Sequence, residues 1–250
     1  EISLGLVGSE MCIRDRESLG LFKNMNIGAQ IAYKQKLFKG TLSIGAQIGF
    51  FDQSFKGSEV YIPDDDDYHQ STDEAIPQQD IRGNAFDLGL GLFYTHRWFW
   101  AGLSATHLNS PSVKLDAETG ENGNERNYEF NLGRTLYFMA GSNIPVKNTL
   151  FEVLPSVLVK TDFTFTTWEA TARVRYNKFL TGGFGYRWKD AAYVVLSAEF
   201  KGFYIGYSYD YPTSAIAKAS SGSHEIFAGY SLKLDLGEKN KHRHKSVRIM

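Results

Sequence analysis

The chain has 250 residues, 42% of them hydrophobic, and a formal net charge of −1. This apolar content excludes a disordered or collagen-like chain, and the lack of a basic excess argues against nucleic acid as a partner. No stretch reaches the roughly 18 consecutive apolar residues that a transmembrane helix requires. Aromatic residues and Gly are abundant beside only 6 Pro, a mixture that favours many strands.

The first segment, residues 1–16, differs from the rest of the chain. It contains the string Gly5–Arg16, which includes Cys12, the only cysteine of the chain. This string resembles a spurious translated sequence that recurs at the ends of unrelated reading frames assembled from environmental DNA. We therefore treat residues 1–16 as a non-native artefact and expect the native N-terminus to be missing. The remainder has no cysteine, and so no disulfide and no thiol nucleophile.

From residue 17 onward, apolar and polar residues alternate with the period of two that is typical of strands with one apolar face. Between Leu42 and Phe50, for example, apolar residues at even positions alternate with Ser, Gly and Gln at odd positions. Many of the strands reach the length of about 9 to 11 residues that a tilted strand needs to cross a bilayer. The pattern predicts eleven strands, at about 24–34, 41–55, 85–96, 98–108, 134–146, 151–162, 166–177, 180–188, 191–200, 202–211 and 224–236.

The connections between these strands alternate in length. The long ones, 56–84, 109–133 and 212–223, all fall on the same side of an up-and-down meander, and the C-terminus falls on the other. Outer-membrane barrels have short periplasmic turns and longer external loops. We therefore predict an all-β, antiparallel up-and-down transmembrane β-barrel over residues 17–236. Because such barrels favour even strand numbers, at least one strand should precede residue 17, and Pro155 inside a strand indicates a bulge or a misassigned strand.

The two faces of the predicted strands differ in chemistry. Aromatic residues near the strand ends on the apolar face predict interface girdles. The opposite face is rich in small polar residues and carries charges that must face the lumen, because exposure to lipid would cost roughly 2 to 4 kcal/mol each. The predicted lumen charges are Glu169, Arg173, Arg175, Arg187 and Glu199.

Several strings resemble the PorP/SprF family of outer-membrane proteins of Bacteroidota, over about residues 20–250. The strings are Phe99–Ser104, Leu154–Lys160, Trp168–Tyr176, Gly202–Tyr211, Ser220–Tyr230 and the tail Lys245–Met250. The resemblance implies a complete barrel of about fourteen strands, so that roughly three are lost here. It also implies a component of the type IX secretion system, which exports proteins with a C-terminal sorting domain.

By this resemblance, the protein is a non-enzymatic component that supports export or surface attachment of sorting-domain proteins such as gliding adhesins. The implied partners are outer-membrane lipid and lipopolysaccharide, other type IX components on the periplasmic side, and a sorting-domain cargo protein. No cofactor and no metal are expected. The alternatives are an outer-membrane channel for small polar solutes or hydrophobic substrates, and a barrel enzyme, for which no nucleophile constellation is present.

The family strings contain the candidate contact residues, which are Tyr207, Ser208, Tyr209, Asp210, Tyr211, Ser221, Gly222, Ser223, His224 and Glu225. The three tyrosines alternate on one face, as in an interface belt or in lumen packing. Gly222 suits a positive φ in a tight turn. We expect His224 and Glu225 to hydrogen-bond the preceding loop, and a catalytic His/Glu pair is the alternative.

Two further segments are strongly charged. Residues 57–81 contain Glu59, Asp64, Asp65, Asp66, Asp67, Asp73, Glu74 and Asp80, with no Lys or Arg. We expect a solvated external loop, with cation binding or partner contact as alternatives, because the EF-hand spacing is missing. Residues 237–250 form a basic periplasmic tail, either solvated or docked on an acidic surface.

Overall fold

The structure, a computed structural model, describes residues 7–60, 79–119, 125–218 and 220–231. These residues form antiparallel strands with two short 3₁₀ turns, η1 (Gly57–Glu59) and η2 (Ala215–Lys218). The prediction of an all-β antiparallel fold is therefore confirmed.

No helix within these described ranges is long and apolar enough to cross a membrane.

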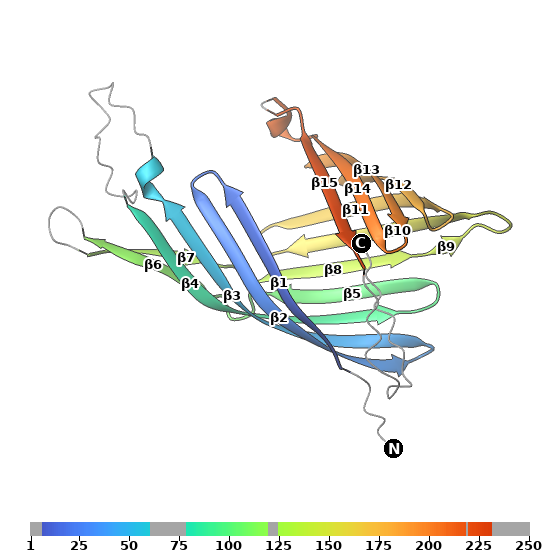
Figure 1. Cartoon of the computed structure of the whole chain (residues 1–250), viewed down its shortest axis with the longest axis horizontal. Helices are drawn as coiled ribbons and strands as arrows, with labels where there is room; N and C mark the ends of the chain where they lie inside the picture. Colours follow the sequence, from blue (N-terminus) through green and yellow to red (C-terminus); the bar gives the residue numbers. More distant parts are fainter. Residues whose placement is uncertain (1–6, 61–78, 120–124, 219, 232–250) are drawn as a thin grey trace, which may run out of the picture.

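One large sheet contains nearly all the strands, and each strand lies next to its neighbours in the chain (Figure 1). The exception is a separate hairpin of β6 (Ser112–Thr119) and β7 (Glu125–Asn131), so that β5 pairs directly with β8. The strands of the large sheet are β1 (Val7–Leu19), β2 (Phe22–Leu37), β3 (Gly40–Lys56), β4 (Asp80–Thr95), β5 (Phe99–Thr106), β8 (Thr135–Ser142), β9 (Ile144–Pro145), β10 (Phe151–Thr161), β11 (Thr166–Tyr176), β12 (Leu180–Arg187), β13 (Ala191–Phe200), β14 (Phe203–Pro212) and β15 (Ser223–Tyr230).

The sheet curves into an open trough (Figure 1). β1 and β15 stand at the two ends of the strand order, and within the described residues they do not pair with each other. All eleven predicted strands are present with small shifts at their ends, although 134–146 is divided into β8 and β9, and only the part of 224–236 up to Tyr230 is described as strand.

A twelfth strand, β1, begins before residue 17 and ends at Leu19. β1 pairs with β2 from Val7 opposite Tyr33 to Leu19 opposite Phe22, with a register shift between Met11 and Ile13. Most of this strand, residues 7–16, lies in the segment that we treated as an artefact.

The connections at one end of the sheet are short, and those at the other end include every long one. We call the first the short-turn end; it holds the connections after β2, β4, β9, β11 and β13. The second, the loop end, holds the connections after β1, β3, β5, β10, β12 and β14. Turns such as Phe38–Lys39 have positive φ at both residues, which matches the twist of a tight two-residue hairpin.

The strand register places apolar residues on one continuous face. Ile31 lies opposite Ala46, Ala46 opposite Leu90, and Leu90 opposite Ala105. The side chains of this apolar face are the more exposed ones: Trp168 in β11 is 59% exposed, whereas its neighbour Glu169 on the other face has a side chain only 20% exposed. The polar face is therefore the crowded, inner side of the trough.

Aromatic residues collect at both ends of the apolar face, as the girdle prediction requires, with aliphatic residues between them. The short-turn end has Phe99, Phe151, Tyr176, Phe200 and Phe203, and the loop end has Phe50, Phe86, Trp168, Tyr186 and Trp188. Neighbouring rings pack across strands, with centroids 4.9 Å apart for Phe151 and Tyr176 and 5.7 Å for Phe50 and Phe86.

Pro155 is a true strand residue, and its pairing with β11 shows no bulge: it lies opposite Ala172 in an unbroken register. Its carbonyl oxygen points toward Gly141 of β8. In an antiparallel strand the N and C=O of one residue point to the same neighbour. The missing N–H therefore faces the side where pairing is interrupted, between Ser156 opposite Gly141 and Val153 opposite Ile144.

Candidate functional site

The connection between β5 and β8 contains the β6–β7 hairpin, which Figure 1 shows at the loop end beside β3 and β4. Strand β6 packs on the polar face of these two strands. Val113 of β6 is fully buried, and Ile81 and Phe55 of the underlying strands are nearly so. The carbonyl of Lys114 lies directly over Gly83, where a side chain would leave no room. These residues form a small apolar core on an otherwise polar face.

Polar contacts fix the base of the hairpin. His107 Nδ1 lies 3.0 Å from Oδ1 of Asp87, whose side chain is buried on the polar face. Asn109 accepts a hydrogen bond from the backbone N–H of Leu88 at 3.1 Å and donates one to the carbonyl of Phe86 at 2.7 Å. The connection after β5 is thus held across β4 before β6 begins.

The sequence pattern identified 109–133 only as a long connection and missed the two strands within it. A signal was present: Val113 and Leu115 alternate with polar residues, as do Tyr128 and Phe130, on either side of Asn122-Gly123. An Asn-Gly pair between two alternating segments is a strong hairpin signal. The two segments are shorter than the neighbouring strands, so they do not match the length that a strand needs to cross a bilayer.

A charged cluster occupies the polar face at the loop end of β11 to β14. Arg187 lies at its centre, with its Nε 3.3 Å from Glu169 and its Nη1 3.1 Å from Asp190 and 3.5 Å from Asp210. Tyr193 donates to Glu169 at 2.6 Å and lies 2.6 Å from the hydroxyl of Thr171. One cation thus holds three carboxylates together. We call the group the Arg187 cluster, and its members are Arg187, Glu169, Asp190, Asp210, Tyr193 and Thr171.

The other predicted lumen charges lie on the same face. Arg175 pairs with Glu152 through its Nε at 2.7 Å, near the short-turn end. Arg173 is half-buried between β10 and β12, and Glu199 is exposed close to the β13–β14 turn and does not enter the cluster. Sequence patterning identified the face of these charges but missed Glu152, Asp190 and Tyr193, because pairing across strands requires the register.

The family strings meet at the β14–β15 connection. Tyr207 Oη lies 2.7 Å from His224 Nδ1, and the ring of Tyr209 packs 4.7 Å from the ring of His224. Tyr209 also donates to the carbonyl of Ser221, and Gly222 has a φ of 112°, as predicted. The loop is thus anchored by Tyr209, whereas His224 contacts the strand.

His224 and Glu225 point to opposite faces of β15, because consecutive strand residues alternate. Glu225 accepts a hydrogen bond at 3.2 Å from Ser208 on the polar face, while His224 contacts the tyrosines on the apolar face. The two side chains therefore do not form a catalytic pair. Tyr211 is exposed on the apolar face, Ser223 lies opposite Asp210, and Asp210 reaches Arg187.

Within the described ranges there is no group of three or more His, Cys, Asp or Glu that could hold a metal ion. Most of the acidic segment, from Asp64 to Glu74, lies outside the described residues, as does the basic tail 237–250. Glu59 and Asp80 are described: Glu59 pairs with Lys56, and Asp80 accepts hydrogen bonds from the backbone N–H of Ser58 at 3.2 Å and from its hydroxyl at 2.7 Å.

A family described as "Type IX secretion system membrane protein PorP/SprF" matches residues 11–230, which include the hairpin, the Arg187 cluster and the tyrosine strings. No curated protein matches the chain.

Proposed function

The chain belongs to the PorP/SprF family of type IX secretion system membrane proteins, and from this we propose a non-enzymatic subunit that supports export or surface attachment of sorting-domain proteins, such as gliding adhesins. The observation that carries the proposal is the family match over residues 11–230. The apolar outer face with its two aromatic belts supports it, since this is the surface that a barrel presents to lipid.

The proposed location is the outer membrane, with the apolar face in contact with lipid and lipopolysaccharide. The loop end faces the exterior, and the short-turn end and the C-terminus face the periplasm, following the usual rule for such barrels. Other type IX components then meet the short-turn end or the basic tail, and a sorting-domain cargo meets the loops.

A channel for small polar solutes or hydrophobic substrates is the second candidate. The polar inner face with the Arg187 cluster favours it, because such a face tolerates water. The β6–β7 hairpin favours the non-channel subunit, because it covers the polar face of β3 and β4 at the loop end.

Secretion of a reporter tests the proposed role. In a bacterium that carries this gene, we would delete it and follow a fluorescent protein fused to a sorting domain encoded nearby. We expect the reporter to be retained in the cells, and the full-length gene to restore export or surface display. Unchanged export and display of every tested sorting-domain protein would contradict the proposal.

Conductance in planar bilayers separates the two candidates. A non-channel subunit should give no steady current, whereas a solute channel should give steady current steps. A persistent open pore in the purified wild-type protein would favour the channel and count against the non-channel subunit.

A further inference from the structure

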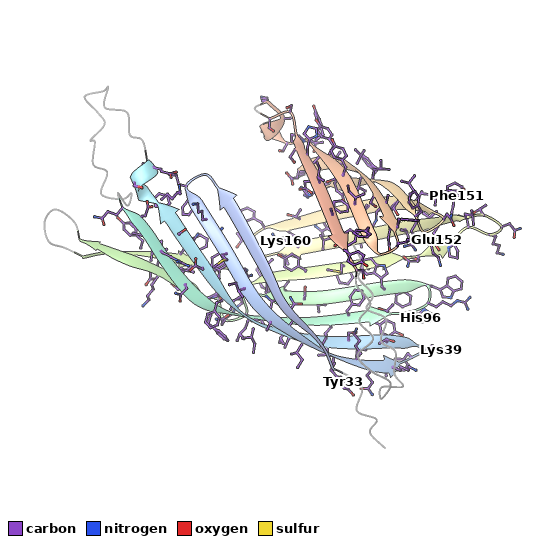
Figure 2. All side chains as sticks on the ribbon, in the orientation of Figure 1. Tyr33, Lys39, His96, Phe151, Glu152 and Lys160 are labelled. Carbon is purple, nitrogen blue, oxygen red and sulfur yellow. The ribbon has the colours of Figure 1, made fainter. Side chains whose placement is uncertain are left out.

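Cations mark every connection at the short-turn end. The turns after β2, β4, β9, β11 and β13 contain Lys39, Arg97, Lys147, Lys178 and Lys201, and none of these turns contains Asp or Glu. All five side chains are exposed, and none forms an ion pair within the described part of the chain. Figure 2 shows Lys39 at this edge of the sheet, near His96.

Turn geometry does not account for these residues. Lys39, Lys178 and Lys201 have φ angles of 62°, 54° and 50°, in the left-handed region where Gly and Asn are favoured over Lys. Glu152 and Glu199 lie within strands on the polar face, and Glu152 pairs with Arg175. The turn cations therefore have no partner of opposite charge in the described chain.

The loop end has a different charge pattern. The connections there after β3, β10 and β12 contain Glu59, Asp162 and Asp190. A basic edge is thus a property of the short-turn end and not of this protein's turns in general.

Three of the five cations, Arg97, Lys201 and Lys39, stand beside aromatic residues. The Arg97 guanidinium lies 4.8 Å from the ring centroid of Trp98, and the Lys201 ammonium lies 5.1 Å from that of Phe200. Phe38, next to Lys39, is 83% exposed. A cation above an exposed aromatic ring at the margin of an apolar surface matches the level of lipid headgroups, where rings lie at the interface and ammonium groups reach the phosphates.

We propose that the short-turn end binds the headgroups of anionic phospholipids through Lys39, Arg97, Lys147, Lys178 and Lys201. The inference rests on the proposed membrane location and adds which lipid and which residues are involved. An acidic protein partner would need the cations gathered in one patch. Here they are spread along the whole edge, one in each turn, which matches a lipid leaflet that surrounds the protein. Basic residues near an anionic leaflet are attracted within about a Debye length, so the interaction is sensitive to salt.

Spin-label electron paramagnetic resonance tests the proposal on the full chain inserted into phosphatidylcholine vesicles. The fraction of motionally restricted probe is compared for spin-labelled phosphatidylglycerol and spin-labelled phosphatidylcholine, which gives a relative association constant. For wild type at low salt we expect a preference for phosphatidylglycerol of about twofold or more, falling toward unity in about 1 M salt. The variant K39Q/R97Q/K147Q/K178Q/K201Q should show a ratio near unity at low salt.

A matched control changes exposed cations at the loop end: K114Q/R134Q/K189Q/K218Q should keep the wild-type preference. A wild-type ratio of unity, or an unchanged ratio in the five-residue variant, would overturn the proposal and leave the proposed function standing. If that variant loses type IX components in a pull-down while lipid preference is unchanged, the edge binds protein instead. Failure of wild type to insert, judged by carbonate extraction, would contradict the proposed membrane location and this inference with it.

Discussion

Gly83 of β4 lies directly beneath Lys114 of β6: a Cβ added at Gly83 would lie 2.2 Å from the Lys114 carbonyl oxygen. Only a residue without a side chain permits the hairpin to approach the polar face so closely. The position of the hairpin therefore depends on Gly83 as well as on the buried side chain of Val113.

Gly83→Val should displace the hairpin and lower the free energy of unfolding by about 1 to 3 kcal/mol, the usual cost of overpacking. Urea unfolding followed by tryptophan fluorescence measures the loss. Gly91→Val is the matched control, since a Cβ there has its nearest contact at 3.6 Å, and we expect a clearly smaller change. Equal effects at both positions would show that Gly83 has no special role.

Val113→Asp should release the hairpin, because the carboxylate would be buried without a partner. We expect proteolysis within residues 107–134 to accelerate by about tenfold or more, since tenfold corresponds to only about 1.4 kcal/mol. A rise in bilayer conductance should accompany it. Lys114→Gln, which changes the exposed neighbour on the same strand, should leave both measurements near wild type. Wild-type proteolysis of Val113→Asp would mean that this contact does not hold the hairpin.

Arg187→Gln should destabilise the protein by about 1 to 2 kcal/mol, because Glu169, Asp190 and Asp210 would face one another without their cation. The side chain is 31% exposed, so solvent screening keeps the loss below that of a fully buried pair. Glu199→Gln, an exposed charge on the same face, should change stability by less than about 0.5 kcal/mol. The midpoint of urea unfolding compares the two variants, and equal shifts would argue against the cluster.

Asp162, in the turn between β10 and β11, should make stability dependent on acid pH. Its Oδ1 accepts hydrogen bonds from the backbone N–H of Phe165 at 2.6 Å and of Thr164 at 2.9 Å, and these lower the pKa of the carboxyl below 3.8. Because the folded pKa is below the unfolded one, the stabilisation is complete above the unfolded value and is lost as the pH falls through the folded value. Asp162→Asn should therefore reduce the loss of stability between about pH 5 and pH 2. An identical pH profile in the variant, measured by urea unfolding, would contradict this assignment.

Strand positions and faces follow from the sequence because the period of two is local. Apolar and polar residues alternate from Leu42 to Phe50 whatever strands lie beside them. The register confirms that Ile44, Ile48 and Phe50 share the apolar face. The end of the sheet at which each connection lies also follows from the sequence, since it needs only the order of the strands. The positive φ of Gly222 follows from its residue type in a short turn.

The candidate site was less accessible to sequence reasoning, because its contacts join residues distant along the chain. Arg187 reaches Glu169 and Asp210 through the registers of β11 with β12 and of β13 with β14. No local pattern near Arg175 indicates that Glu152 lies directly opposite it. The separation of His224 and Glu225 is predictable from alternation alone, but the tyrosine partners of His224 are not.

By itself, the sequence determined the alternating strands, the two chemically distinct faces and the family resemblance, because each depends on residues close together in the chain. Only the tertiary structure decided that the connection after β5 packs over Gly83 and that Arg187 holds three carboxylates. These features arise when strands far apart in sequence are brought side by side, and the physical reason is the pairing of backbone hydrogen bonds that sets their register.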